Sequence, residues 1–245
     1  MANLGASKTI TRSNISFILQ HPSVLISYAR GGKTEAYRVA LRNLLNRLSK
    51  CEESEIEMLL HSSSSSLQVP KDVLQYRNIE FSEFSNIVML YYLVRVSKPS
   101  EIVETGVWSG KTSWTILHAL TDNGKGHLTS IDLGKKQCDG IKLPTTEIGG
   151  FVPETLRKSW TLKLGDAHEL LPETLSKLGA IDMFYHDSNH TYEHMTFEFT
   201  TALSCLKKGG IICSDDINMN NAWIDFSQLL KCHYEVDNKF GYGYA

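Results

Sequence analysis

The chain has 245 residues, with 25 lysines and arginines against 27 aspartates and glutamates, and a formal net charge of −2. This balance supplies no polycationic surface for a nucleic-acid backbone, which disfavours a nucleic-acid partner. The longest apolar stretch, residues 87–94, is far too short to cross a bilayer, and the first residues lack the apolar core of a signal peptide. Five scattered cysteines with no C-x-x-C pair fit a reducing compartment, so we expect a cytoplasmic protein without a membrane partner.

Residues 1–98 differ in pattern from the rest and are expected to form an N-terminal helical extension. Residues 33–50 carry tyrosine and leucine on one helical face, and further helices are predicted over 53–60 and 81–96. The five-serine tract at 62–66 reads as a loop or linker. We interpret the extension as a cap or as the surface of a homo-oligomer, and the alternative is a lid over the substrate.

Residues 99–245 form the second predicted domain, in which apolar runs alternate with helical segments. Such repeated β-α units imply a parallel sheet with right-handed crossovers. We therefore expect a Rossmann-like α/β fold with a mostly parallel seven-stranded sheet and helices on both faces. Strands are predicted at 101–105, 128–132, 161–164, 181–185, 211–214, 233–236 and 240–244, helices at 111–120, 169–178 and 192–206, a helix stop at 207–210 and a long insertion at 133–159.

The turn after the first predicted strand, E-T-G-V-W-S-G, is typical of a cofactor site. Gly106 and Gly110 flank the change from strand to helix, where glycine permits positive φ and close approach of a ligand. The helix N-terminus that follows offers unpaired N–H groups, and Glu104 beside it can hold a cationic group. Position 108 is Trp and the spacing is G-x-x-x-G instead of G-x-G-x-x-G, which weighs against NAD. The alternative is an ordinary tight β-α turn.

Two further aspartates follow predicted strands at the same edge of the sheet. Asp132 ends the second strand, where ribose hydroxyls are bound in this architecture. Asp166 follows the third strand, where an adenine amino group would lie. Each of them has an alternative interpretation as the N-cap of the next helix.

Three carboxylates at the ends of the fourth and fifth strands predict a metal site. Asp187 follows the fourth strand, and Asp215 and Asp216 follow the fifth. Neighbouring parallel strands lie ~5 Å apart, so these side chains can converge on one point. Oxygen ligands suit a hard divalent cation, Mg²⁺ first, with Ca²⁺ or Mn²⁺ as substitutes. The alternative is that Asp187 caps a helix and the Asp pair begins a turn.

Taken together, the segments E-T-G-x-x-x-G, S-I-D, L-G-D-A, H-D-S-x-H-T-Y-E-H and L-K-K-G-G-I-I-C-S-D-D-I resemble a class I S-adenosylmethionine-dependent methyltransferase. More narrowly, they resemble the metal-dependent small-molecule O-methyltransferases of the catechol and macrolide-sugar type. The likeness runs from about residue 80 to the end of the chain. It implies S-adenosylmethionine as the cofactor, with Asp132 on the ribose and Asp166 and Ala167 on the adenine. The turn would contribute Glu104, Thr105, Gly106, Trp108, Ser109 and Gly110 around the methionine part.

The same resemblance assigns Asp187, Asp215 and Asp216 to the cation and makes Asp187 and His190 the catalytic pair. His190 stands three residues after Asp187, where catechol enzymes carry a lysine and some sugar enzymes a histidine, and it is our candidate base. His186 and His194 compete for this role.

We therefore expect an O-methyltransferase that acts on a hydroxyl of a small molecule, a sugar or a secondary metabolite, with a bound divalent metal. Two other classes compete with this function. One is a nucleotide-binding oxidoreductase, and the other is a non-catalytic S-adenosylmethionine-binding module. A glycine pair in the insertion, Gly149 and Gly150, predicts a mobile loop over the site, in which Phe151 either touches the substrate or anchors the loop.

Overall fold

The computed structural model describes residues 90–91, 93–138, 140–235 and 240–245. The predicted helices at 33–50 and 53–60, the serine tract and most of the proposed extension lie outside these residues. The elements are β1 (Glu101–Thr105), α6 (Lys111–Asn123), β2 (His127–Asp132), β3 (Gln137–Cys138), β4 (Ile141–Lys142), α7 (Glu154–Arg157), β5 (Trp160–Leu164), α8 (Ala167–Leu178), β6 (Ile181–His186), α9 (Tyr192–Leu203), β7 (Leu206–Ser214), α10 (Ala222–Ser227), β8 (Cys232–Glu235) and β9 (Gly241–Tyr244).

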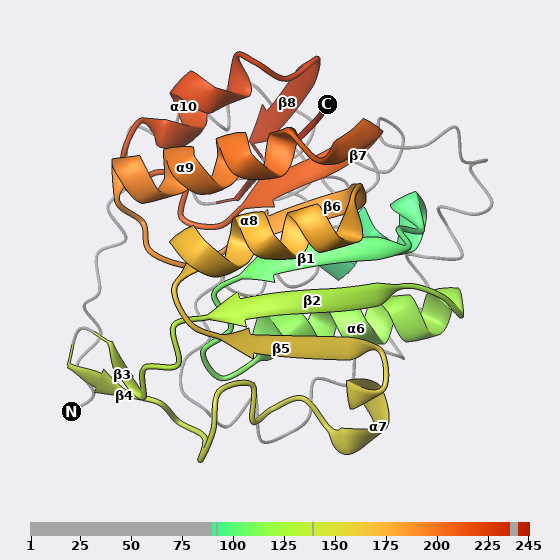
Figure 1. The fold of residues 1–245 in the computed structure, drawn as a ribbon, viewed down its shortest axis with the longest axis vertical. Helices are drawn as coiled ribbons and strands as arrows, with labels where there is room; N and C mark the ends of the chain where they lie inside the picture. The colour runs from blue at the N-terminus through green and yellow to red at the C-terminus, as the bar shows by residue number, and fades with distance from the viewer. Residues whose placement is uncertain (1–89, 92, 139, 236–239) are drawn as a thin grey trace, which may run out of the picture.

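Seven strands form one sheet in the order β5-β2-β1-β6-β7-β9-β8 (Figure 1). The first five strands in this order are parallel, and β9 runs antiparallel to both of its neighbours. A small hairpin, β3-β4, stands apart from this sheet. The Rossmann-like, mostly parallel seven-stranded sheet that the sequence predicts is therefore confirmed.

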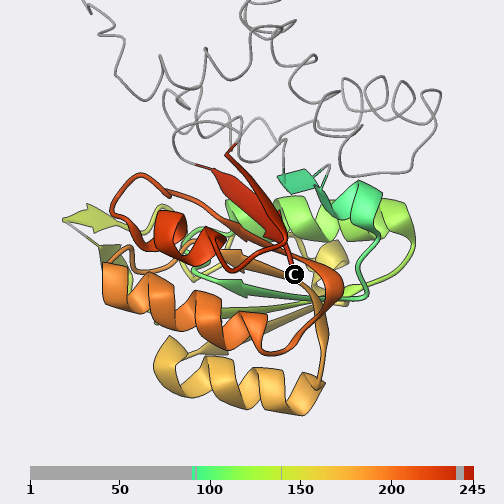
Figure 2. The same cartoon turned by 90° about the horizontal axis from the view of Figure 1, so that it is seen from above.

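Helices cover both faces of the sheet (Figure 2). On one face, α6 packs with the helical residues 90–91 and 93–97 in a core that includes Trp114, Leu117 and Tyr185. On the other face, α8, α9 and α10 enclose a second core with Phe184, Phe199 and Trp223. Strands β1, β2 and β6 lie between these layers, so consecutive residues of each strand are buried instead of alternate ones.

One sequence prediction about the local structure is wrong. The segment Lys207–Gly210 was expected to stop the helix before the fifth strand, but it lies inside β7, which begins at Leu206. Helix α9 already ends at Leu203. Pairing stabilises the additional residues at the start of β7. Leu206 aligns with Ile181, and the carbonyl of Gly210 accepts a hydrogen bond from the amide of Ala245.

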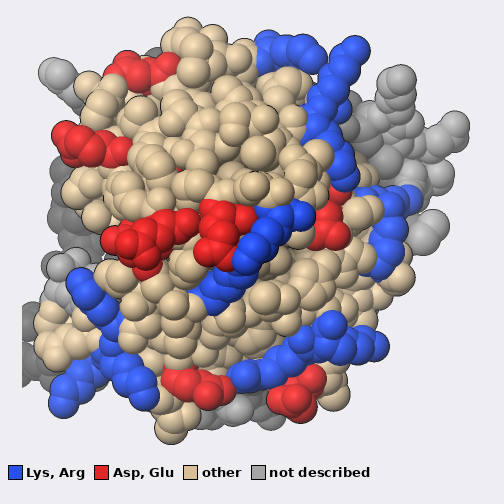
Figure 3. Space-filling model, in the orientation of Figure 1, with Lys and Arg blue, Asp and Glu red and all other residues tan. Residues whose placement is uncertain are grey.

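The surface carries both signs of charge. On the face drawn in Figure 3, acidic and basic side chains lie together over α8, whereas most of the surface over α9 carries neither charge. In the part of the chain that the structure describes, no helix combines the length and the apolar character needed to span a bilayer.

Candidate active site

The turn after β1 is pressed against the end of β6. Gly106 has φ of 83°, and a Cβ atom added there would lie 1.8 Å from the carbonyl oxygen of Asp187. The Asp187 amide donates to the Thr105 carbonyl at 2.8 Å. A side chain at position 106 would collide with backbone, which explains the glycine and places the predicted cofactor turn directly beside the predicted metal carboxylate.

Asp132 organises this turn from the end of β2. Its Oδ2 accepts hydrogen bonds from the amides of Val107 and Trp108, both at 2.9 Å, and its Oδ1 accepts one from Gly134 at 2.7 Å. Trp108 has φ of 50°, a left-handed conformation that is costly for a bulky side chain, and such strained residues cluster at functional sites. The ribose contact of Asp132 stays a prediction, and the structure shows that its carboxylate supports the turn.

Glu104 lies at the centre of a buried polar network behind the turn. Its carboxylate accepts hydrogen bonds from the hydroxyls of Thr112, Ser113 and Ser130 at 2.6–2.7 Å. The Ser130 hydroxyl in turn accepts from the indole of Trp160 at 2.8 Å. Burial raises the pKa of Glu104 to about 7 despite these hydroxyl donors, which favour the ionised form. Glu104 thus joins β1 to β2 and α6, and its contact with a cofactor stays a prediction.

The insertion after β2 docks on the same turn. The amides of Gly149 and Phe151 donate to the carbonyls of Trp108 and Ser109 at 2.7 and 2.9 Å. A Cβ atom on Gly110 would lie 2.8 Å from the Cα atom of Gly149, so neither backbone leaves room for a side chain between them. Ser109 is buried beneath this contact. In this conformation the glycine pair of the insertion is tied to the turn by backbone hydrogen bonds.

Asp166 and Ala167 lie at the start of α8. Asp166 is the N-cap of this helix, and its side chain accepts a hydrogen bond from the His168 amide at 2.8 Å. This bond and a second one from the His168 ring lower the pKa of Asp166. The side chain is 56% exposed, which leaves it accessible. The capping interpretation thus describes the observed geometry, and an adenine contact stays a prediction.

The three predicted metal carboxylates lie close enough to influence one another. Burial raises the pKa of Asp187 well above its usual range, and the negative charges of Asp215, Glu104 and Asp216 raise it further, whereas Lys111 opposes them. Asp216 has φ of 46°, and its amide donates to the Asp215 carboxylate at 2.8 Å. Among the described residues, however, no group of three His, Cys, Asp or Glu side chains is arranged to hold a metal ion.

His190 lies in the loop between β6 and α9. Its ring lies edge-on to that of His186, with the centroids 5.2 Å apart, and its carbonyl accepts a hydrogen bond from Asn220 at 2.9 Å. Burial, followed by the charge of His186, lowers the pKa of His190 to about 4, so the imidazole is neutral at pH 7. Charge effects on His190 come mainly from His186 and Asp216, whereas those on Asp187 come mainly from Asp215.

Sequence reasoning missed two supporting elements of the site. The first is the set of hydroxyl side chains around Glu104, which come from α6 and from β2, the strand paired with β1. The second is Glu198, a buried carboxylate on α9 that contacts both His186 and His194. One signal for Glu198 was present in the sequence, because it follows His194 by four residues and so shares a helical face with it.

A family model described as a methyltransferase domain matches residues 103–217, which hold the turn, Asp132 and all three carboxylates. A search of curated proteins gave no match. The chain has the class I methyltransferase fold, and the family match over residues 103–217 supports the methyltransferase activity that the sequence motifs predicted.

Solved structures with the same fold are distant in sequence. An O-methyltransferase from Bacillus cereus in complex with S-adenosylhomocysteine has 15% identity and a TM-score of 0.51, covering 84% of this chain and 97% of its own. CalS11, a TDP-rhamnose 3'-O-methyltransferase of calicheamicin biosynthesis, has 15% identity and a TM-score of 0.54, with 80% and 96% covered. TomG from Streptomyces achromogenes, solved with S-adenosylmethionine, has 17% identity and a TM-score of 0.52, with 80% and 99% covered.

Proposed function

We propose that this methyltransferase transfers the methyl group of S-adenosylmethionine to a hydroxyl of a small molecule, with a divalent cation beside the acceptor. The observation that carries this proposal is the contact between the turn at Gly106 and the backbone of Asp187. It lies between the proposed cofactor turn and the proposed metal carboxylates, and it supports a site in which a methyl donor and an acceptor hydroxyl meet at one edge of the sheet. The acceptor we favour is a sugar or a secondary metabolite with neighbouring hydroxyls.

The donor chemistry of the carboxylate cluster fits a cation. Asp187 lies in a partly buried position where the charges of Asp215 and Asp216 disfavour its ionised form, and a bound cation would reverse that effect. Oxygen-only ligands favour Mg²⁺ or a similar ion. Since the described side chains are not already arranged around a point, binding would have to draw the three carboxylates together.

In the proposed reaction, the methyl carbon leaves the sulfonium sulfur as it bonds to the hydroxyl oxygen, and the sulfur keeps the electron pair. The products are S-adenosylhomocysteine and a methyl ether. The hydroxyl proton goes to His190 or to solvent, and the neutral imidazole of His190 has a nitrogen lone pair that can accept it. The residues of the turn hold the donor in line with the acceptor, so the protein contributes chiefly by positioning the two. When bound, a cation supplies positive charge beside the acceptor oxygen.

Calorimetric titration tests the cofactor first. We expect S-adenosylmethionine and S-adenosylhomocysteine to bind and NADH and NADPH not to bind, and the opposite result would favour a nucleotide-binding oxidoreductase. A methylation assay then follows with catechol, methyl glycosides carrying neighbouring hydroxyls, and TDP-rhamnose, the sugar named for CalS11. Binding without turnover across this panel would favour a non-catalytic binding module.

The cation is tested by the same assay with EDTA and with added Mg²⁺. We expect EDTA to abolish turnover and Mg²⁺ to restore it, and we expect Asp187→Asn to reduce turnover at least a hundredfold. Asp225→Asn is a matched control, because Asp225 is exposed on α10, where its carboxylate accepts a hydrogen bond from the Tyr192 hydroxyl. Turnover that survives EDTA would remove the cation from the proposal. The homo-oligomer and the cytoplasmic location expected from the sequence remain proposals as well.

A further inference from the structure

A buried carboxylate on α9, outside the residues assigned so far, ties together the segments that carry the proposed chemistry. Glu198 is fully buried. Its Oε2 lies 2.5 Å from the Thr105 hydroxyl and 2.6 Å from Nδ1 of His186. Its Oε1 lies 2.9 Å from the Ser188 hydroxyl and 2.8 Å from Nε2 of His194. One carboxylate therefore holds the end of β1, the end of β6, the loop after β6 and the first turns of α9.

The hydrogen bonds to this carboxylate decide which ring nitrogen of each histidine carries the proton. Although burial acts to raise it, the pKa of Glu198 is lowered to about 2 by hydrogen bonds from His186 and His194. An ionised carboxylate only accepts hydrogen bonds, and its lone pairs take about four donors. All four neighbours must therefore donate, so His186 carries its proton on Nδ1 and His194 carries one on Nε2.

The position of the His186 proton matters for the neighbouring ring. His186 is fully buried, and within the described part of the chain its Nε2 makes no hydrogen bond, nor does Nε2 of His190. The two rings meet edge to face at a centroid distance of 5.2 Å. With its proton on Nδ1, His186 keeps an unprotonated Nε2, so this tautomer sets the polarity of the ring that packs against His190. The other tautomer would place a buried N–H group without a partner at Nε2 of His186.

We propose that Glu198 is a positioning residue for the methyl-transfer reaction, which fixes the tautomer of His186 and thereby the placement of His190 and of the loop from Asp187 to His190. This inference rests on the proposed function, in which His190 receives the hydroxyl proton. Glu198 acts through His186 and Ser188 and does not itself touch a substrate. Its ionised form is needed because only a group that accepts at both oxygens imposes one tautomer on each histidine.

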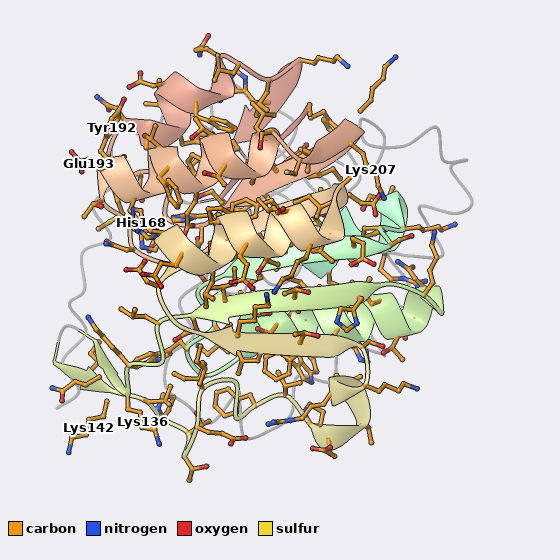
Figure 4. The ribbon with its side chains drawn as sticks, viewed as in Figure 1. Lys136, Lys142, His168, Tyr192, Glu193 and Lys207 are labelled. Carbon is orange, nitrogen blue, oxygen red and sulfur yellow. The ribbon has the colours of Figure 1, made fainter. Side chains whose placement is uncertain are left out.

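The variant Glu198→Gln tests this role, since it keeps the size of the side chain but replaces one acceptor oxygen by a donor NH₂ group. The NH₂ group of the glutamine must face either His186 or His194. The histidine that it faces then has to accept a hydrogen bond, so its proton must move to the other ring nitrogen. The matched control is Glu193→Gln on the same helix, whose side chain is exposed at the start of α9 (Figure 4).

Nitrogen-15 NMR of histidine-labelled full-length protein reads the tautomers directly and needs no substrate. In the wild type and in Glu193→Gln we expect His186 protonated on Nδ1 and His194 on Nε2. In Glu198→Gln we expect one of the two to switch. Unchanged tautomers in Glu198→Gln, or a wild-type His186 protonated on Nε2, would overturn the inference whether or not the protein methylates a hydroxyl.

Kinetics give the second readout, on whichever of catechol, methyl glycoside or TDP-rhamnose the wild type methylates. We expect Glu198→Gln to lower kcat at least tenfold while the KM for S-adenosylmethionine changes less than twofold, with Glu193→Gln unchanged in both. A kcat equal to that of the wild type would refute the positioning role. If the wild type binds no S-adenosylmethionine, the proposed function fails, and the NMR result still decides the tautomer.

Discussion

Replacing Glu104 by glutamine should make the stability of the protein less sensitive to pH. Glu104 is fully buried, and its pKa in the folded protein is about 7 against an ordinary value of 4.5. An acid with a raised pKa binds its proton more tightly in the folded state. The stability that this proton contributes is complete below pH 4.5 and is lost as the pH rises through 7. Glutamine has nearly the same shape and no charge to lose.

The size of the effect follows from the shift in pKa. One pKa unit corresponds to about 1.4 kcal/mol, so a shift from 4.5 to about 7 corresponds to about 3 kcal/mol over the full titration. Between about pH 5 and about pH 8.5, the unfolding free energy of the wild type should fall by about 2.5 kcal/mol relative to that of Glu104→Gln. For a protein of 245 residues, the melting temperature of the wild type should therefore fall by roughly 5–10 °C relative to that of Glu104→Gln over this pH range.

Urea unfolding at both pH values, followed by circular dichroism, measures this difference. The control is Glu154→Gln, whose side chain is 92% exposed and pairs only loosely with Arg157, so its effect should be the same at both pH values. Any fixed cost of rearranging the hydroxyls of Thr112, Ser113 and Ser130 cancels in the comparison between pH values. A free-energy difference between Glu104→Gln and the wild type that stays constant from pH 5 to 8.5 would refute the reasoning.

Two further predictions concern the turn and the α9 carboxylate. Gly106→Ala should destabilise the protein by more than about 2 kcal/mol and abolish cofactor binding, because its Cβ would meet the Asp187 carbonyl at 1.8 Å. Gly124→Ala, with a similar positive φ and open space around it, should cost only about 1 kcal/mol, and equal losses in thermal unfolding would contradict the collision. For Glu198 the pH dependence of stability has the opposite sign to that of Glu104. Its pKa of about 2 gives stability that is present above pH 4.5 and is lost as the pH falls toward 2. Urea unfolding should therefore show the wild type losing about 2 kcal/mol more than Glu198→Gln between pH 6 and pH 3, whereas parallel losses would argue against an ionised carboxylate.

The strands were predictable because parallel strands buried on both faces leave a simple pattern in the sequence. The first strand was predicted at its observed bounds, Glu101–Thr105, and the next three lie within a residue of theirs at each end. The fifth was too short, since Lys207 and Lys208 suggested a helix end. Nothing local shows that this segment continues β7, because its partners are Ile181 and the chain end.

The site was predictable only where function demands a residue at a strand end. Asp132 and Asp187 stand out in the sequence because each one follows an apolar run. The partners of these carboxylates come from elsewhere, as when Ser130 and Trp160 reach Glu104 through the pairing of three strands. Such contacts depend on register and burial, which a single sequence does not reveal. The roles of His190, Asp166 and the metal carboxylates stay predictions for the same reason.

The docking of the insertion on the glycine turn has a consequence for protein engineering. Gly149 and Phe151 bond the backbone of Trp108 and Ser109, and Gly110 leaves no space between the two segments. An exchange of residues 143–153 would therefore also change the backbone contacts that support the turn. The two loops must therefore be transplanted between methyltransferases as a single cassette.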